Sequence, residues 1–169
     1  MRKKLVTAVI AVTAVGLVAG GASLAAQGPS NDNQPLVLHL ISRATAINNI
    51  VDTGPAGFSP GDLYVFSDRY FLASEPDEQI GSVDGRCVLI DPAAIRFDCS
   101  VTNTLTGAGG LPAGNIMAAG PLTLSQGSMS TFAIVGGTGT YRTARGDATV
   151  ELGPPDGPHQ VTVNLILNP

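Results

Sequence analysis

Residues 131–150, TFAIVGGTGTYRTARGDATV, decide how the rest of this chain is read. The apolar run 132–135 leads directly into Gly136, Gly137, Thr138 and Gly139, so a buried strand turns sharply at glycines. The residues that follow are rich in β-branched and aromatic types and lack helical periodicity. The stretch therefore predicts two strands joined by a tight corner.

The glycines of this corner do not indicate a nucleotide site. A dinucleotide-binding fingerprint requires a third glycine at the start of a helix, and Arg142 occupies that place. A phosphate-binding loop requires a lysine before its serine or threonine, and the corner has none. Both classes of nucleotide site are excluded here.

The remaining chain consists of apolar segments separated by turns rich in Gly, Pro and Asp, including residues 48–60 and 75–78. No segment shows a convincing helical pattern. Eight sequential strands with short links predict an all-β, eight-stranded antiparallel β-barrel, with a β-sandwich as the alternative that composition alone does not separate. The predicted strands are 36–42, 62–72, 80–90, 94–103, 115–124, 128–135, 140–152 and 160–167.

The N-terminus has the pattern of a secretory signal peptide. Three basic residues precede an apolar body at residues 5–18, and small residues follow through Ala26. We expect a signal peptide at residues 1–25, a flexible segment at 26–35 and a barrel domain at 36–169. The apolar body is short for a membrane span, so an uncleaved anchor is the weaker alternative, and the cleaved protein is expected to be secreted with no membrane partner.

The charge of the cleaved chain argues against nucleic acid as a partner. It keeps six arginines, no lysine and thirteen acidic groups, a net charge of 6 minus 13, or −7. Binding to a phosphate backbone requires a basic face.

Two separated stretches resemble the dirigent protein and allene oxide cyclase superfamily. The corner is similar to the pattern "GGTGxFxxARG" of that superfamily. Residues 61–70, GDLYVFSDRY, and 80–90, IGSVDGRCVLI, are similar to the cyclase patterns "GDLxxFxNxLY" and "VGxxxGxCVLI". The resemblance covers most of residues 36–167, and it favours an allene oxide cyclase-like barrel over a sandwich.

The chain has two cysteines, and in a secreted protein they are expected to form one disulfide. Cys87 and Cys99 each lie six residues from Ala93, so they face each other in a hairpin centred on that turn. The alternative is a free functional thiol at Cys87, at a place where the cyclases have a cysteine in their pocket.

A candidate site lies on the second predicted strand, where Tyr64, Phe66, Asp68 and Tyr70 share one face. Asp68 stands where the cyclase pattern has a pocket asparagine and where dirigent proteins commonly have an aspartate. The resemblance implies a catalytic acid or charge stabiliser among substrate-binding rings. The alternative is a surface carboxylate near a turn, paired with Arg69 or another arginine.

Two further catalytic candidates are His39 and Arg142. His39 aligns with a glutamate that assists epoxide opening in the cyclases. A histidine in place of that glutamate argues against allene oxide cyclase activity itself. The alternative for His39 is a packed or surface residue without a chemical role. If the apolar residues after the corner face inward, Arg142 enters the barrel, whereas a bulge at Gly146 would turn Arg145 inward instead. Pairing of both arginines with surface carboxylates is the remaining option. Tyr141 completes the predicted substrate-binding residues.

These features predict a barrel that acts on a small lipophilic molecule without a cofactor. Two histidines, no cysteine cluster and no spaced carboxylates argue against a metal or redox cofactor, and no hydrolase pattern is present. A cofactor-free isomerase or cyclase is the first reading, a non-catalytic dirigent-like binding barrel the second, and a filled structural barrel the third. The resemblance also implies a homotrimer. If the polar residues of 160–164 point into the barrel, the apolar row of residues 161–167 must be covered by another subunit, and if they point outward a monomer is sufficient.

Overall fold

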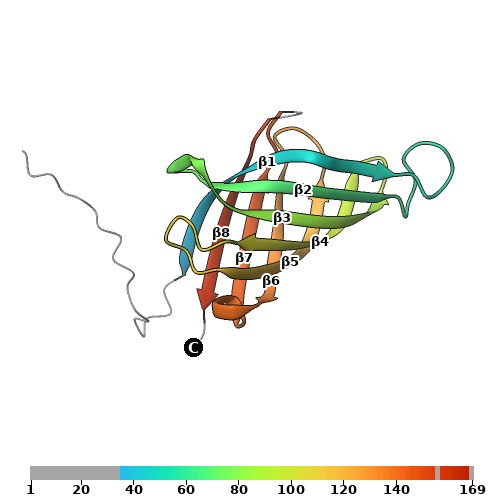
Figure 1. The fold of residues 1–169 in the computed structure, drawn as a ribbon. Coiled ribbons are helices and arrows are strands. Elements are labelled where there is room, and N and C mark those ends of the chain that lie inside the picture. The colour runs from blue at the N-terminus through green and yellow to red at the C-terminus, as the bar shows by residue number, and fades with distance from the viewer. Residues whose placement is uncertain (1–34, 155–156, 168–169) are drawn as a thin grey trace, which may run out of the picture.

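The chain forms one closed barrel in which every strand pairs with its sequence neighbours and the last strand pairs with the first (Figure 1). The structure, a computed structural model, describes residues 35–154 and 157–167. The eight antiparallel strands confirm the predicted barrel and exclude the sandwich. They are β1 (Leu36–Val51), β2 (Leu63–Leu72), β3 (Glu75–Asp91), β4 (Arg96–Leu105), β5 (Gly114–Thr123), β6 (Met129–Gly137), β7 (Ala144–Glu151) and β8 (His159–Leu167).

The predicted signal peptide at residues 1–25, and nearly all of the segment predicted after it, lie outside the described residues. Within the part of the chain that the structure describes, no helix is both long and apolar enough to cross a membrane.

Three strand boundaries differ from the prediction by more than two residues. β1 continues past Ser42 to Val51, because pairing with β2 outweighs the turn preference of Asn48 and Asn49. β3 begins at Glu75, where a turn was predicted, and its first residues pair with β2 through two register shifts. Residues 139–141 form a short 3-10 helix, so β7 begins four residues later than predicted.

The glycine-rich corner folds across one end of the barrel. Tyr141 in the 3-10 helix η1 (Gly139–Tyr141) is fully buried, and its hydroxyl donates to Pro112 O at 3.0 Å. A Cβ at Gly137 would collide with the backbone oxygens of Asn115 and Tyr141, which explains the glycine there. The stretch that indicates the fold therefore packs one end of the barrel rather than lining its interior.

The side chains of β8 settle which of its rows faces inward. Val161, Val163 and Leu165 are buried, whereas Gln160 is exposed and Thr162 and Asn164 are half-buried. The apolar row points into the barrel, so this strand supplies no argument for a trimer.

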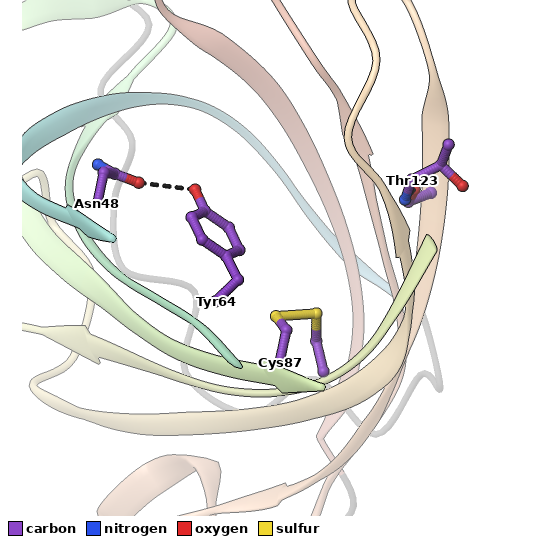
Figure 2. Close-up of a disulfide and its surroundings, with 6 residues drawn as sticks. Asn48, Tyr64, Cys87 and Thr123 are labelled. Carbon is purple, nitrogen blue, oxygen red and sulfur yellow. Dashed lines mark hydrogen bonds between the residues drawn. A yellow bond between two sulfur atoms is a disulfide. The ribbon is translucent and has the colours of Figure 1, made fainter. Parts of the chain in front are cut away.

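The predicted disulfide is present. Cys87 and Cys99 are directly opposite each other on β3 and β4, with 4.0 Å between their Cα atoms (Figure 2). Both are buried, and the free-thiol alternative for Cys87 is wrong.

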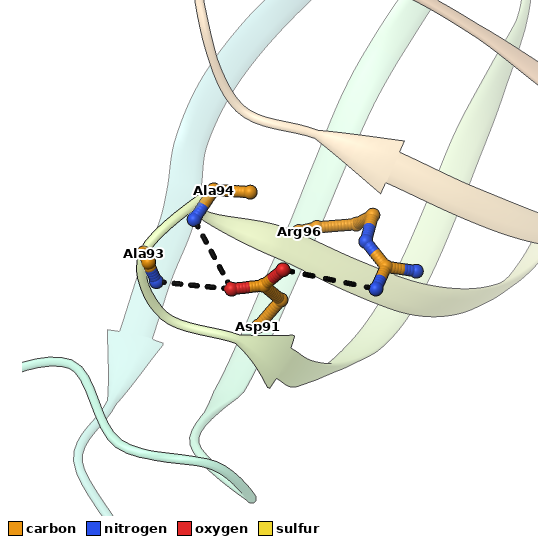
Figure 3. Close-up of polar contacts among 4 residues, drawn as sticks. All are labelled: Asp91, Ala93, Ala94 and Arg96. Carbon is orange, nitrogen blue, oxygen red and sulfur yellow. Dashed lines mark hydrogen bonds and ion pairs between the residues drawn. The ribbon is translucent and has the colours of Figure 1, made fainter.

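The hairpin turn between β3 and β4 is held by Asp91. Its Oδ1 accepts hydrogen bonds from the backbone N–H groups of Ala93 and Ala94, at 3.1 and 3.2 Å (Figure 3). Its other oxygen lies 3.8 Å from Arg96 Nη2 across the turn. Beyond this turn the register shifts once, between Leu89 and Asp91, and the pairing that follows brings the two cysteines together.

Candidate functional site

A cavity of about 410 Å³ occupies one half of the barrel. Its mouth lies at the end that carries the loops between β5 and β6 and between β7 and β8, because Ser125, Gln126, Gly153 and Pro154 line it there. The half near η1 is packed and contains a void of only about 10 Å³. A cavity of this volume is in the range of small-molecule sites, and the reading of a completely filled interior is wrong.

Most of the cavity wall is apolar and aromatic. The rings of Tyr64 and Phe66 stack with centroids 5.2 Å apart, and Phe97 lies 5.8 Å from Tyr64. Phe66 can lie against β3 because Gly85 has no side chain: a Cβ there would overlap the Phe66 ring. The apolar part of the wall includes Val83, Val101, Leu122, Phe132, Val150 and Val161.

Asp68 lies in this wall and is 5% exposed. Its Oδ2 accepts a hydrogen bond from Ser42 Oγ at 2.8 Å, and its Oδ1 accepts one from Asn48 Nδ2 at 3.4 Å. No arginine of the described residues forms an ion pair with Asp68, and Arg69 is exposed on the other face of the strand. Asp68 is therefore an interior carboxylate without a cation beside it, not the surface residue of the alternative reading.

A bulge in β1 brings Asn48 to Asp68. The register with β2 shifts between Ala44 and Asn48, and Thr45 Oγ1 holds the bulge by donating to Ser67 O at 2.6 Å. Asn48 then accepts a hydrogen bond from the Tyr64 hydroxyl at 2.7 Å (Figure 2).

The prediction missed Asn48 because it ended the first strand at Ser42. The signal was nevertheless present in the alternation. Residues 42, 44 and 48 have the same parity, and all three line the cavity.

The hydroxyls of the two cavity tyrosines donate hydrogen bonds to other side chains of the cavity wall. Burial, and secondarily the negative charge of Asp68, raise the pKa of Tyr64 to about 12. The same two causes raise the pKa of Tyr70, whose hydroxyl donates to Asn103 Oδ1 at 2.8 Å. Asn103 is fixed in turn by donating to Ile116 O at 3.0 Å. Both tyrosines are neutral near physiological pH.

His159 is a cavity residue that the sequence analysis overlooked. It is half-buried at the start of β8, lines the cavity and lies directly opposite Ser42 on β1. Its parity with Val161, Val163 and Leu165 was the available signal.

His39, Arg142 and Tyr141 do not join the cavity. His39 is exposed on the outer face of β1, with Nδ1 3.4 Å from Thr162 Oγ1. Arg142 is exposed just after η1, and the expectation that it enters the barrel is wrong because strand alternation begins only at Ala144. Tyr141 is buried at the packed end.

Arg145 also points away from the interior. It is exposed, and its Nη1 donates to Ala144 O at 2.7 Å. Of the predicted site residues, the structure brings together Tyr64, Phe66, Asp68 and Tyr70.

The fold and the site define a class: a closed β-barrel with a cavity open at one end, suited to one small, largely apolar molecule. Comparison with known families makes this specific. Residues 43–164 match the family described as the allene oxide cyclase barrel like domain, and the chain belongs to that family. A search of the curated proteins finds no match.

Solved structures agree with this assignment. A pyocyanin demethylase is 27% identical, with a TM-score of 0.62, and the match covers 77% of this chain and 99% of that one. A pterocarpan synthase dirigent protein is 20% identical, with a TM-score of 0.58 and coverage of 78% and 87%. An exo-specific intermolecular Diels–Alderase is 20% identical, with a TM-score of 0.61 and coverage of 78% and 96%. The last two are evidence of the shared fold alone.

Proposed function

We propose that this barrel takes a small lipophilic molecule into its cavity and acts on it as a cofactor-free isomerase or cyclase, with Asp68 as the charged group. The observation that carries the proposal is the position of Asp68, which is buried in the cavity wall beside aromatic rings and forms no ion pair with an arginine of the described residues. A carboxylate in such a place is costly to bury. Its proposed action on the bound molecule explains why a carboxylate is retained at this position.

The arrangement suits chemistry within one molecule. A carboxylate accepts hydrogen bonds at about four lone-pair positions, and Ser42 and Asn48 occupy two of those on Asp68. The remaining positions can accept a proton from the bound molecule or stabilise positive charge that develops on it. The rings of Tyr64 and Phe66 would hold the reacting ends close to each other, which itself lowers the barrier of a cyclisation.

His39 and Arg142 have no part in this proposal, because both side chains are exposed outside the cavity. The proposal includes secretion. The signal-peptide pattern at residues 1–25 and the Cys87–Cys99 disulfide both support it, since disulfides persist in oxidising compartments.

The second candidate is a non-catalytic barrel that binds or steers a small molecule, as the dirigent resemblance implies. It is favoured by the way the wall donors are used: Ser42, Tyr64 and Tyr70 all donate within the wall and leave few groups free for chemistry. Turnover separates the two candidates, whereas binding alone does not.

The first experiment is native mass spectrometry of the protein purified from its source, which should find a retained apolar molecule. The neutral fluorophore N-phenyl-1-naphthylamine provides an independent measure, and we expect it to bind with one site per barrel. A protein that retains nothing and leaves the fluorophore unbound would contradict both candidates.

The decisive variant is Asp68→Asn, which keeps the shape and removes the charge. Turnover of the retained molecule should fall roughly 10²-fold or more, while the barrel stays folded. The matched control is Asp84→Asn, the same change on the exposed face of β3, which should leave turnover unchanged. Full turnover in Asp68→Asn would contradict the catalytic reading, and absent turnover in the wild type would leave the binding barrel.

A further inference from the structure

The imidazole of His159 is fixed at one nitrogen only. The backbone N–H of Gly153 donates to Nδ1 at 3.1 Å. A backbone N–H can only donate, so Nδ1 presents its lone pair and the proton of the neutral ring lies on Nε2. Nε2 has no hydrogen-bond partner among the described residues and is not sealed from solvent, since the described part of the chain has no buried polar side-chain atom without a partner.

The neutral form of this ring is the favoured one. Partial burial lowers the pKa of His159, and the negative charge of Asp68 offsets only part of that effect. Protonation at Nδ1 would in addition lose the bond from Gly153. Around neutral pH the ring is therefore a donor through Nε2–H and not a cation.

The hydroxyl donors deeper in the cavity are already engaged. The hydroxyls of Ser42, Thr45, Tyr64 and Tyr70 donate to Asp68, Ser67, Asn48 and Asn103, respectively. Ser125 and Gln126 also line the cavity, but both are exposed at its mouth. Among the described residues that line the cavity, His159 thus offers a ring N–H that no protein group accepts.

We infer that His159 is a specificity-determining residue that donates a hydrogen bond from Nε2 to an acceptor atom of the ligand. The inference rests on the proposed function of the cavity and adds the chemical class of its occupant: a compact apolar molecule with a neutral acceptor, such as a ketone oxygen. An acidic group on the ligand is disfavoured, because it would add a second negative charge to the one that Asp68 places in the cavity.

The test uses two probes of nearly equal shape, 1-tetralone, which carries a ketone, and tetralin, which does not. Binding of each probe is measured by isothermal titration calorimetry. We expect the wild type to bind 1-tetralone roughly 3- to 10-fold more tightly than tetralin, the range of one neutral hydrogen bond. The variant His159→Phe should bind both probes alike, and the control His39→Phe, on the outer face, should keep the preference.

A second measurement needs no variant at the site. Nitrogen NMR of the ¹⁵N-histidine-labelled wild type should show Nε2 protonated and Nδ1 unprotonated in His159, and Nε2 should shift on saturation with 1-tetralone but not with tetralin. Equal affinity of the two probes for the wild type, or an unchanged Nε2 signal with 1-tetralone bound, would overturn the role of His159 and leave the proposed cavity function standing. Failure of both probes to bind would overturn the cavity function itself.

Discussion

Phe66 lies against the backbone of Gly85 on the adjacent strand, at a place where even a methyl group would overlap its ring. The two residues are directly opposite each other on β2 and β3, so the missing side chain of one sets the position of the other. This contact determines how far an aromatic ring projects into the cavity.

Gly85→Ala is therefore expected to push the Phe66 ring toward the cavity and reduce its volume. We expect binding of N-phenyl-1-naphthylamine to weaken by at least tenfold and the free energy of unfolding to fall by about 1–3 kcal/mol, as for other overpacked sites. In a Phe66→Leu background the same substitution should cost much less, which a double-mutant cycle measures. Additive effects would contradict the contact.

The tyrosines provide a reporter of the charge on Asp68. That charge contributes to the raised pKa of Tyr64, about 12, so Asp68→Asn should lower the pKa of Tyr64 toward its ordinary value of 10 and also lower that of Tyr70. Tyrosinate absorbance measured against pH checks this directly. The pKa of Tyr141 is raised by burial alone, so Tyr141 should not respond to the variant. Unchanged titration of all three tyrosines would contradict the placement of Asp68.

The same pKa shifts predict alkaline instability. A tyrosine pKa raised in the folded state means that the native protein holds its proton more tightly than the unfolded chain does. The resulting stabilisation is complete below about pH 10 and is lost as pH rises from 10 through the folded values. The free energy of unfolding should fall across that window, and Tyr64→Phe should make the fall shallower.

The disulfide should contribute measurably to stability. It closes a loop with a sequence separation of 12, for which the chain-entropy model gives about 3 kcal/mol. Reductant should therefore lower the free energy of unfolding of the wild type by about that amount in urea titrations. It should have no effect on the double variant Cys87→Ala/Cys99→Ala, and thiol titration of the denatured wild type should find no free thiol before reduction.

The loop between β1 and β2, which projects from the barrel, depends on Asp62 (Figure 1). The carboxylate of Asp62 accepts hydrogen bonds from the backbone N–H groups of Thr53 at 2.9 Å and Ser59 at 2.8 Å, and these bonds lower its pKa. A lowered pKa stabilises the folded loop above about pH 4 and ceases to do so as pH falls through the folded value. Asp62→Asn should weaken hydrogen-exchange protection of those two amides at neutral pH, and Asp84→Asn should not.

Much of the barrel could be predicted because the alternation of β8 and the glycines of the corner are local signals. Val161, Val163 and Leu165 could be recognised as one face without any tertiary information. The position of Arg142 could not, because a 3-10 turn at residues 139–141 resets the alternation, and that turn depends on Tyr141 packing against a loop 29 residues away.

The candidate site was predicted in part because strand alternation is a local signal there too. Tyr64, Phe66, Asp68 and Tyr70 lie on one uninterrupted strand, so parity alone groups them. Parity also places Asn48 and His159 on inward-facing rows. Asn48 nevertheless meets Asp68 only through a bulge, and His159 joins the same cavity wall only because β8 pairs with β1. Such contacts between distant parts of the chain carry no local signature.

The packed end of the barrel has a kinetic consequence. If the half near η1 stays packed, a molecule that enters the cavity must leave through the same opening. Product must therefore dissociate before another substrate molecule can bind. Product should then act as a purely competitive inhibitor. In a reaction between two molecules, the first to enter would lie deeper in the cavity and could not dissociate until the second had left.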